Sequence, residues 1–182
     1  MKKTRYLLIA GILLLDQIVK YAVRAGMELG ETIPVIKNVF HLTYVQNRGA
    51  AFNMFDGMQG FLTMVPLIAL VFAVWYMEKH LAEHVTQLFA LVLIISGGLG
   101  NLIDRIWLGF VTDMFDCRFI DFPVFNIADI AICVGCFFLV VFIFFFDKPQ
   151  QGEKADPAAA GFPQYIRPDE KYRQNQNPCH DR

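Results

Sequence analysis

The sequence predicts an all-α membrane protein, a bundle of four transmembrane helices with a small β-rich segment outside the membrane. Hydrophobic residues make up 55% of the 182 residues, 18 of them Phe, and the mean hydropathy is +0.42. Most apolar residues fall in four blocks, each near the ~20 residues that a helix needs to cross the hydrocarbon core. The formal net charge of −1 argues against a nucleic-acid partner, since no basic surface is available to neutralise phosphates.

The first apolar block follows Lys2, Lys3 and Arg5 and resembles the core of a signal peptide. No small-residue cleavage site follows it, so the block is interpreted as a retained helix whose basic cluster places both termini in the cytoplasm. Trp75 and Trp107 lie near block ends, where their rings anchor helices at the membrane surface. The helices are predicted over about 6–23, 61–77, 88–103 and 124–146, within one domain, 1–146.

The chain between the first two helices, about 28–56, is predicted to lie outside the cytoplasm and to be rich in β-structure. Residues 33–36 and 39–45 are β-branched and aromatic runs of the kind that form strands. After residue 146 the chain becomes polar and contains several prolines. That composition predicts a disordered cytoplasmic tail over 147–182.

Two carboxylates, Asp113 and Asp129, lie next to or inside apolar blocks. A charge at membrane depth is costly, so such residues indicate a functional site. If the loop before the fourth block folds back, Asp113 can meet Asp129, and two close carboxylates divide into an acid and a base, the chemistry of aspartic proteases. Residue types alone do not choose Asp113 over Asp116 or Asp121, and a surface loop with three solvated acids remains the alternative.

The third block carries the densest polar pattern of the chain. Gly97, Asn101, Asp104 and Arg105 fall at helical spacings on one face. Glycine lets a neighbouring helix approach, and the polar side chains can then hydrogen-bond across the contact. Asp104 and Arg105 are interpreted as contacts that fix helix packing. For Asn101, packing and a direct chemical role both stay open.

Two further polar pairs occur at helical spacing. Lys20 is one turn from Asp16, which predicts an ion pair. Asn126 and Asp129 are three residues apart, which predicts that both lie on the same side of the fourth helix.

Parts of the sequence also fit two other protein classes, a thiol oxidoreductase and a proton-coupled transporter. Cys133 and Cys136 have the spacing of redox motifs, but they lie within an apolar helix and are interpreted as small packing residues. A thiol oxidoreductase would need a cysteine pair on the outer side, where only Cys117 is expected. A proton-coupled transporter would carry its acids near the midplane rather than at one surface. No convergent His and Cys set is present, so neither a metal nor another cofactor is expected.

Five spaced motifs follow one another between about 6 and 146: Asp16-Gln17-x-x-Lys20, Asn47-x-Gly49-x-Ala51-Phe52, Gly97-x-x-x-Asn101-x-x-Asp104-Arg105, Gly109-x-Val111-x-Asp113 and Phe125-Asn126-x-Ala128-Asp129. Together they resemble the lipoprotein signal peptidases, the type II signal peptidases of bacteria. Phe110 and Met114 depart from the family's pattern beside the first aspartate.

The resemblance implies an intramembrane aspartyl endopeptidase of the bacterial cytoplasmic (inner) membrane. Such an enzyme removes the signal peptide from a prolipoprotein, cutting before the cysteine that carries diacylglycerol. Asp113 and Asp129 would be the catalytic dyad, facing the outer leaflet. The implied partners are prolipoprotein substrates, membrane lipid and inhibitors of the globomycin type. The chain is expected to act as a monomer.

The resemblance also implies supporting roles. The β-rich loop would cradle the lipidated peptide, and Asp16, Lys20 and Asn47 would brace the outer mouth of the site. The residues that would hold the dyad and the substrate are Gly97, Asn101, Asp104, Arg105 and Asn126.

Overall fold

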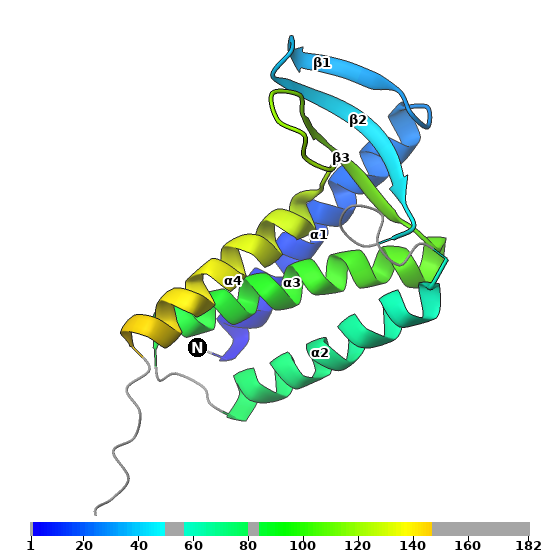
Figure 1. Ribbon diagram of the computed structural model, residues 1–182. Coiled ribbons are helices and arrows are strands. Elements are labelled where there is room, and N and C mark those ends of the chain that lie inside the picture. The colour runs from blue at the N-terminus through cyan, green and yellow to red at the C-terminus, as the bar shows by residue number, and fades with distance from the viewer. Residues whose placement is uncertain (1, 50–56, 80–83, 147–182) are drawn as a thin grey trace, which may run out of the picture. The chain divides into compact units, whose positions relative to one another are not determined.

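The computed structural model describes residues 2–49, 57–79 and 84–146, which belong to one compact unit. The predicted tail, 147–182, lies outside the described residues, as do residues 50–56 of the predicted β-rich loop. Helices and strands follow one another along the chain as α1 (Lys2–Gly26), β1 (Thr32–Ile36), β2 (Phe40–Asn47), α2 (Gln59–Lys79), α3 (Val85–Leu108), β3 (Val111–Cys117) and α4 (Ile127–Phe145) (Figure 1).

The helix α3 is the centre of the bundle. The other three helices pack against it, and 61% of the residues in its most apolar 18-residue stretch are buried, against 17–22% in the others. All four helices are long and apolar enough to cross a membrane, which confirms the four predicted helices. Their remaining apolar side chains face outward, as expected when lipid rather than water surrounds a bundle.

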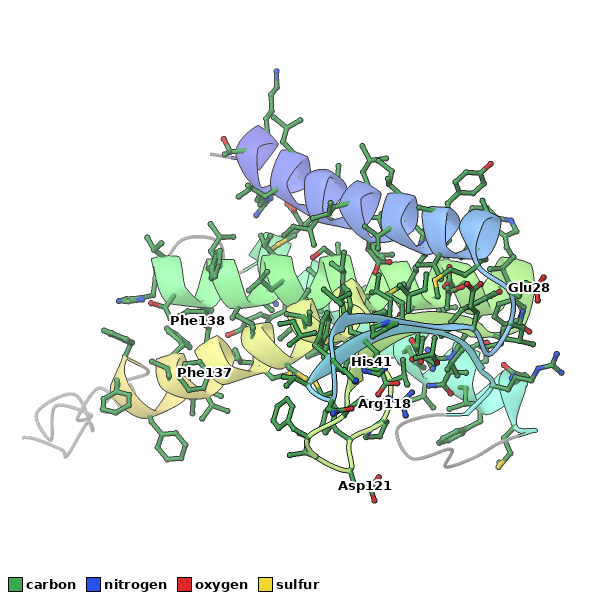
Figure 2. All side chains as sticks on the ribbon, turned by 90° about the horizontal axis from the view of Figure 1, so that it is seen from above. Glu28, His41, Arg118, Asp121, Phe137 and Phe138 are labelled. Atoms are coloured by element: carbon green, nitrogen blue, oxygen red, sulfur yellow. The ribbon has the colours of Figure 1, made fainter. Side chains whose placement is uncertain are left out.

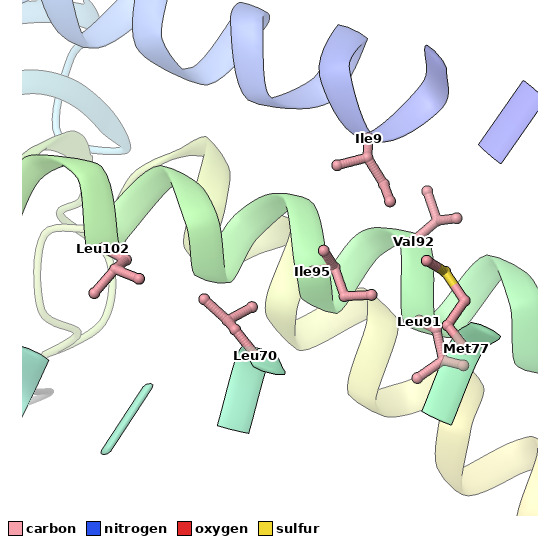
Figure 3. Packing of buried hydrophobic residues seen from close by; sticks show 7 residues of the cluster. All are labelled: Ile9, Leu70, Met77, Leu91, Val92, Ile95 and Leu102. Carbon is pink, nitrogen blue, oxygen red and sulfur yellow. The ribbon is translucent and has the colours of Figure 1, made fainter. Parts of the chain in front are cut away.

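Apolar residues from three helices form the main core. Figure 3 shows Ile9 of α1, Leu70 and Met77 of α2, and residues of α3 meeting in one cluster, whose α3 members are Leu91, Val92, Ile95 and Leu102. Burial of such side chains contributes roughly 1.5–3 kcal/mol each relative to water. Because lipid is also apolar, close packing rather than transfer from water holds the helices together.

The sheet and the polar loops around it lie at one end of the molecule. Figure 2 shows Glu28, His41, Arg118 and Asp121 around the sheet, whereas Phe137 and its neighbour on α4 extend from the helices farther away. Phe137 is 63% exposed. We refer to the two ends of the bundle as the sheet end and the opposite end.

The helices are longer than predicted, or begin elsewhere. The third was expected over 88–103 but runs to Leu108, so Trp107 belongs to its last turn. The fourth was expected from residue 124 but begins at Ile127, because the extended residue Asn126 caps it. For the first three helices, hydropathy marks the apolar part and misses the turns that continue each helix at its ends.

The sheet has three antiparallel strands in the order β1–β2–β3. Its first two strands overlap the runs predicted to be strands, 33–36 and 39–45, and β2 extends two residues farther, to Asn47. The third, β3, was not predicted, since a loop was expected over 107–123. The label all-α therefore does not cover the whole fold. Pairing of Val45 with Asp113 and of Asn47 with Val111 fixes the register of β3 next to β2.

A glycine turns the chain from α3 directly into β3. Gly109 has a φ of 77°, a left-handed conformation that favours glycine, and its N–H donates to the carbonyl of Arg105 at 3.2 Å. The helix ends there, and β3 begins two residues later. This tight connection brings Asp113 back beside the polar residues at the end of α3.

A second glycine sets the distance between α3 and α4. A Cβ at Gly97 would meet the carbonyl oxygen of Ala128, and would lie 2.9 Å from Cγ1 of Ile132. The expectation that this glycine admits a neighbouring helix is therefore confirmed. The two helices make the most extensive contact in the molecule.

We expect Gly97→Ala to lower the melting temperature measured in detergent. The added methyl group has to displace the backbone of α4, and overpacking of this kind costs about 1–3 kcal/mol. Gly11→Ala is the matched control, because a Cβ at Gly11 has nothing within 4 Å. Equal melting temperatures for the two variants would show that α4 can move away without loss.

Candidate active site

Asp113 and Asp129 reach the site from elements of different kinds. Asp113 is on β3 and is almost completely buried, at 2% exposure. Asp129 lies in the first turn of α4, where its Oδ2 accepts the N–H of Asn126 at 3.1 Å and Asn126 Oδ1 accepts the N–H of Asp129 at 2.9 Å. This reciprocal cap fixes the start of α4. Asn126 and Asp129 are thus on the same side, as predicted, although Asn126 precedes the helix.

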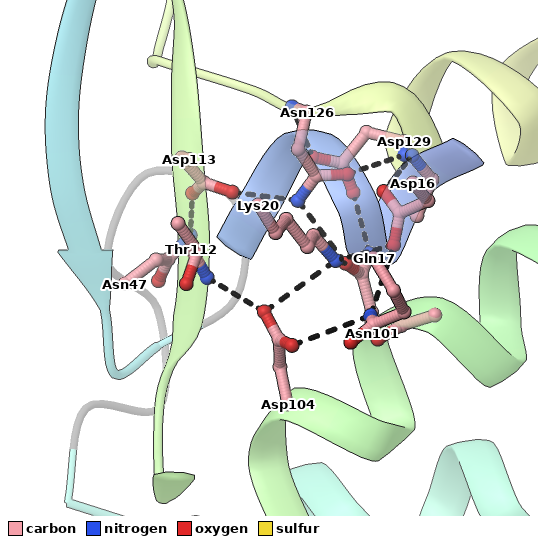
Figure 4. A network of polar contacts seen from close by, with 12 residues as sticks. Asp16, Gln17, Lys20, Asn47, Asn101, Asp104, Thr112, Asp113, Asn126 and Asp129 are labelled. Atoms are coloured by element: carbon pink, nitrogen blue, oxygen red, sulfur yellow. Dashed lines mark hydrogen bonds and ion pairs between the residues drawn. The ribbon is translucent and has the colours of Figure 1, made fainter. Parts of the chain in front are cut away.

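Side-chain amides connect the two carboxylates (Figure 4). Asn126 Nδ2 donates to Asp113 Oδ1 at 2.7 Å and to Asn101 Oδ1 at 3.1 Å. Asn101 Nδ2 donates to Asp129 Oδ1 at 2.7 Å. Asn47 Nδ2 donates to the other oxygen of Asp113 at 3.0 Å. The three amides hold both carboxylates at one place and supply only donors to them.

The electrostatic setting of Asp113 differs from that of a solvated acid. Burial, followed by the negative charge of Asp129, raises the pKa of Asp113 to about 7. The hydrogen bonds from Asn47 and Asn126 and the charge of Lys20 lower this pKa and so limit the rise. Near neutral pH, Asp113 therefore exchanges a proton readily, which is the property that a general acid or base requires.

Beneath the amides lies the ammonium group of Lys20, which is fully buried. Its Nζ is 2.9 Å from Asn101 Oδ1, 2.9 Å from Asp16 Oδ2 and 3.5 Å from Asp104 Oδ2. The predicted pairing of Lys20 with Asp16 is confirmed. Because an ammonium group can only donate, Lys20 requires the oxygen of the Asn101 amide to face it, which leaves the amide nitrogen for Asp129.

The carboxylates around Lys20 also hold backbone. Asp16 Oδ1 accepts the N–H of Ala128 in α4 at 2.9 Å. Asp104 Oδ2 accepts the N–H of Thr112 in β3 at 3.0 Å. The residue before each candidate catalytic aspartate, Ala128 before Asp129 and Thr112 before Asp113, therefore donates its N–H to a carboxylate that contacts Lys20.

Sequence reasoning missed three members of this network. Arg24 Nη1 donates to Thr112 Oγ1 at 2.8 Å and lies 3.7 Å from Asp104 Oδ1. Gln17 Nε2 donates to the carbonyl of Gly100 at 3.1 Å. Gln17 belongs to the first motif, so the sequence could have indicated that it takes part in the network. Arg24 and Thr112 meet only through the register of β3, which no local pattern revealed.

Arg105, in the last turn of α3, lies beside the two carboxylates. Its Nη2 donates to the carbonyl of Gly49 at 3.3 Å. The same side chain lines the pocket that contains Asp113 and Asp129. A guanidinium in this position offers further donors to a group that enters the pocket.

The pocket itself has a volume of about 240 Å³ and two kinds of wall. One wall is the polar set of the two aspartates with Asn47, Asn101 and Arg105. The other is apolar and comes from the loop before α4 and from α4 itself: Phe122, Pro123, Val124, Phe125 and Ile132. Such a pocket fits a ligand that joins a peptide group to an apolar chain.

The other acids of the loop lie elsewhere. Asp116 is also on β3, but it accepts from Thr43 Oγ1 at 2.6 Å and pairs with Arg118 at 2.8 Å. Asp121 is exposed in the connection to α4. Of the three acids that residue types left open, only Asp113 meets Asp129.

The interpretation of Cys133 and Cys136 as packing residues is wrong. Both thiols are free and exposed on α4, so they face the surroundings of the bundle, and Cys133 also lines the pocket. Cys117, on β3, is half-buried and free.

The described part of the chain contains no group of three or more His, Cys, Asp or Glu side chains that could hold a metal ion. The expectation of a reaction without metal or other cofactor stays a prediction.

Comparison with known proteins agrees with this geometry. The model of the family described as signal peptidase (SPase) II matches residues 8–145. A lipoprotein signal peptidase of Clostridioides difficile (strain 630) is 48% identical over 144 residues, covering 79% of this chain and 97% of the relative. The lipoprotein signal peptidase of Lactococcus lactis subsp. lactis (strain IL1403) is 46% identical over 144 residues, with coverages of 79% and 94%. A solved bacterial membrane enzyme is similar with a TM-score of 0.74 and 30% identity, over 78% of this chain and 88% of that one. The chain, a multi-pass membrane protein, therefore belongs to the signal peptidase II family.

Proposed function

We propose that this chain is an intramembrane aspartyl endopeptidase that removes the signal peptide from prolipoproteins. The cut falls before the cysteine that carries diacylglycerol, and Asp113 and Asp129 form the catalytic pair. The relatives named as lipoprotein signal peptidases support the substrate class. The observation that carries the assignment of the pair is the meeting of these two carboxylates in one pocket, one of them with a pKa raised to about 7.

In the reaction, one carboxylate removes a proton from a water molecule, and the oxygen of that water attacks the scissile carbonyl. The raised pKa of Asp113 favours this residue as the protonated partner. Asp113 then donates to the carbonyl oxygen while Asp129 acts as the base. The tetrahedral intermediate collapses when the leaving amine receives a proton, which releases the signal peptide and the lipidated product.

The neighbouring residues hold this arrangement. Asn101 and Asn126 fix the carboxylates by donating to them, and Lys20 with Asp16 and Asp104 fixes the Asn101 amide. Arg105 and Asn47 line the pocket and offer donors to the substrate backbone. The close contact at Gly97 keeps α4, and with it Asp129, against α3.

The diacylglyceryl group of the substrate explains why the active site lies at the membrane. Each CH₂ of a buried acyl chain contributes about 0.8 kcal/mol to membrane affinity, so the diacylglyceryl group stays in the bilayer and the scissile bond stays near its surface. We place the sheet end at the outer leaflet of the cytoplasmic (inner) membrane, with both termini in the cytoplasm and the enzyme acting as a monomer. Inhibitors of the globomycin type should compete for the same pocket.

Replacement of either aspartate tests the catalytic pair. We expect Asp113→Asn and Asp129→Asn each to abolish cleavage of a diacylglyceryl-modified precursor by the purified enzyme, because an amide keeps the shape but neither takes nor gives the catalytic proton. Asp121→Asn is the control in the same loop and should retain activity. Turnover near that of the wild type in either of the first two variants would contradict the assignment.

Removal of the lipid from the substrate tests the substrate class. An unlipidated precursor with the same peptide should be cut far more slowly at equal total concentration, since the apolar burial that holds the scissile bond at the site is lost. The ratio of the initial rates for the two precursors is the measurement. Equal rates would mean that the enzyme reads the peptide alone.

The titration of Asp113 gives a test that does not depend on turnover. In the wild type, the infrared band of the protonated carboxyl should disappear as the pH rises through about 7. In Asp129→Asn the midpoint should fall, because the negative charge that disfavours ionisation of Asp113 is gone. Burial remains, so the midpoint should stay above that of a solvated Asp. An unchanged midpoint would show that the two carboxylates do not interact.

A further inference from the structure

The end of α1 supports β3 from the side opposite the pocket. Side chains alternate between the two faces of a strand. Val111 and Asp113 share the face of β3 that lines the pocket. Thr112 and Met114 share the other face, and Met114 packs with Val23 of α1 in a small buried cluster. The place of Asp113 in the pocket therefore depends on how the other face of β3 rests on α1.

A row of charged residues runs along α1 toward this contact. Asp16, Lys20 and Arg24 follow one another at intervals of four residues, so they lie on the same side of the helix. Both cations reach Asp104 of α3, with Lys20 Nζ 3.5 Å from Oδ2 and Arg24 Nη1 3.7 Å from Oδ1. Asp104 thus has one cation near each of its oxygens, and Arg24 is the one at the end of α1.

Thr112 is held through two of its own groups. Its N–H donates to Asp104 Oδ2 at 3.0 Å, as Figure 4 shows beside Asp113. Its hydroxyl oxygen accepts from Arg24 Nη1 at 2.8 Å. Thr112 is 0% exposed, so water has no access to replace either contact. One contact fixes the backbone of β3, and the second fixes the side chain on the face away from the pocket.

The polar contact adds a direction that apolar packing lacks. Met114 and Val23 attach β3 to α1 through burial, which has no preferred direction. A hydrogen bond favours an angle above about 150° at its hydrogen, so the contact between Arg24 and Thr112 limits how far β3 can rotate. Rotation of β3 would move Asp113, the next residue along the strand.

Small movements of Asp113 matter for a reaction. Its two oxygens accept from Asn126 at 2.7 Å and from Asn47 at 3.0 Å, and it meets Asp129 in the pocket. Displacement of a reacting group by about 1 Å can lower a rate about 100-fold. A side chain that prevents such a displacement therefore contributes to the rate without touching the substrate.

We propose that Arg24 is a positioning residue, which holds Asp113 in the pocket by way of the Thr112 hydroxyl and Asp104. The proposal rests on the proposed function and assigns a task to a side chain that does not line the pocket. Arg24 acts on β3 from the face opposite the substrate, so its loss affects the chemical step rather than substrate binding.

A double-mutant cycle tests this route. Thr112→Val removes the hydroxyl and keeps the shape, and Arg24→Met removes the donor and keeps most of the length. We expect each change to lower kcat about tenfold or more for the diacylglyceryl-modified precursor, with KM within about twofold of the wild type. The double variant should be no slower than Arg24→Met alone, because that change already breaks the contact. Assays run well below the melting temperature of each variant, so that loss of folded enzyme does not enter kcat.

Two controls accompany the cycle. Thr112→Ser keeps the hydroxyl and should bring kcat to within about threefold of the wild type. Arg118→Met removes another arginine that pairs with an acid of β3, since Arg118 Nη2 lies 2.8 Å from Asp116 Oδ2. That pair lies three residues beyond Asp113, and kcat should stay at the wild-type value. If Arg24→Met is not recovered in folded form, the comparison of Thr112→Val with Thr112→Ser decides alone.

The protonation of Asp113 gives a second measurement, which a role in folding alone would not change. Thr112→Val alters no charge. Because burial and the charge of Asp129 raise the pKa of Asp113 to about 7, displacement of Asp113 from these surroundings should lower it. The midpoint of the infrared band of the protonated carboxyl should therefore fall in Thr112→Val and stay in place in Thr112→Ser.

Several results would overturn the proposal. Wild-type kcat in both single variants would do so, as would losses that add in the double variant. An unchanged infrared midpoint in Thr112→Val would mean that Arg24 only stabilises the fold. If the wild type does not cleave the lipidated precursor, the proposed function is wrong, and the infrared midpoints still decide whether Thr112 positions Asp113.

Discussion

The site depends on the contacts of the buried Lys20 ammonium group. It stands between Asp16 and Asp104 and donates to Asn101, so that one side chain of α1 sets charges and hydrogen bonds on α3. Removal of one partner from a buried ion pair typically costs about 3–5 kcal/mol, because the remaining charge keeps no counter-charge. Here the loss would also free the Asn101 amide to turn, and with it the donor that holds Asp129.

From this cluster two connections lead to the candidate catalytic residues. Asp16 holds the backbone at the start of α4, one residue before Asp129. Asp104 holds the backbone of β3, one residue before Asp113. The strand β3 and the helix α4 are thus both hydrogen-bonded to carboxylates that surround the Lys20 ammonium group. The geometry of the pair depends on these two backbone contacts as well as on the amides between the carboxylates.

The sequence was a good guide to the helices and a poor one to β3. Apolar blocks of membrane length need no partner to be recognised, whereas β3 contains Asp113 and Asp116 and is stabilised by pairing with β2, which no local pattern records. For the same reason the start of α4 was placed too early, since Asn126 acts as a cap through a contact with Asp129. Motif spacing found both aspartates and the amides around them. Arg24 and Thr112 were not predicted as part of the network, because their contact forms only when β3 is paired in register.

The tight turn at Gly109 has a consequence for the biogenesis of the protein. It makes α3 and β3 one continuous unit, so Asp113 can be in place as soon as the third helix has inserted and the sheet has formed. Asp129 arrives only with α4, the last helix of the described residues to leave the ribosome. A chain whose insertion stops before that helix holds one carboxylate of the proposed catalytic pair, Asp113, and lacks Asp129. If the two aspartates are the catalytic pair, as proposed, the site becomes complete only when α4 has packed against α3.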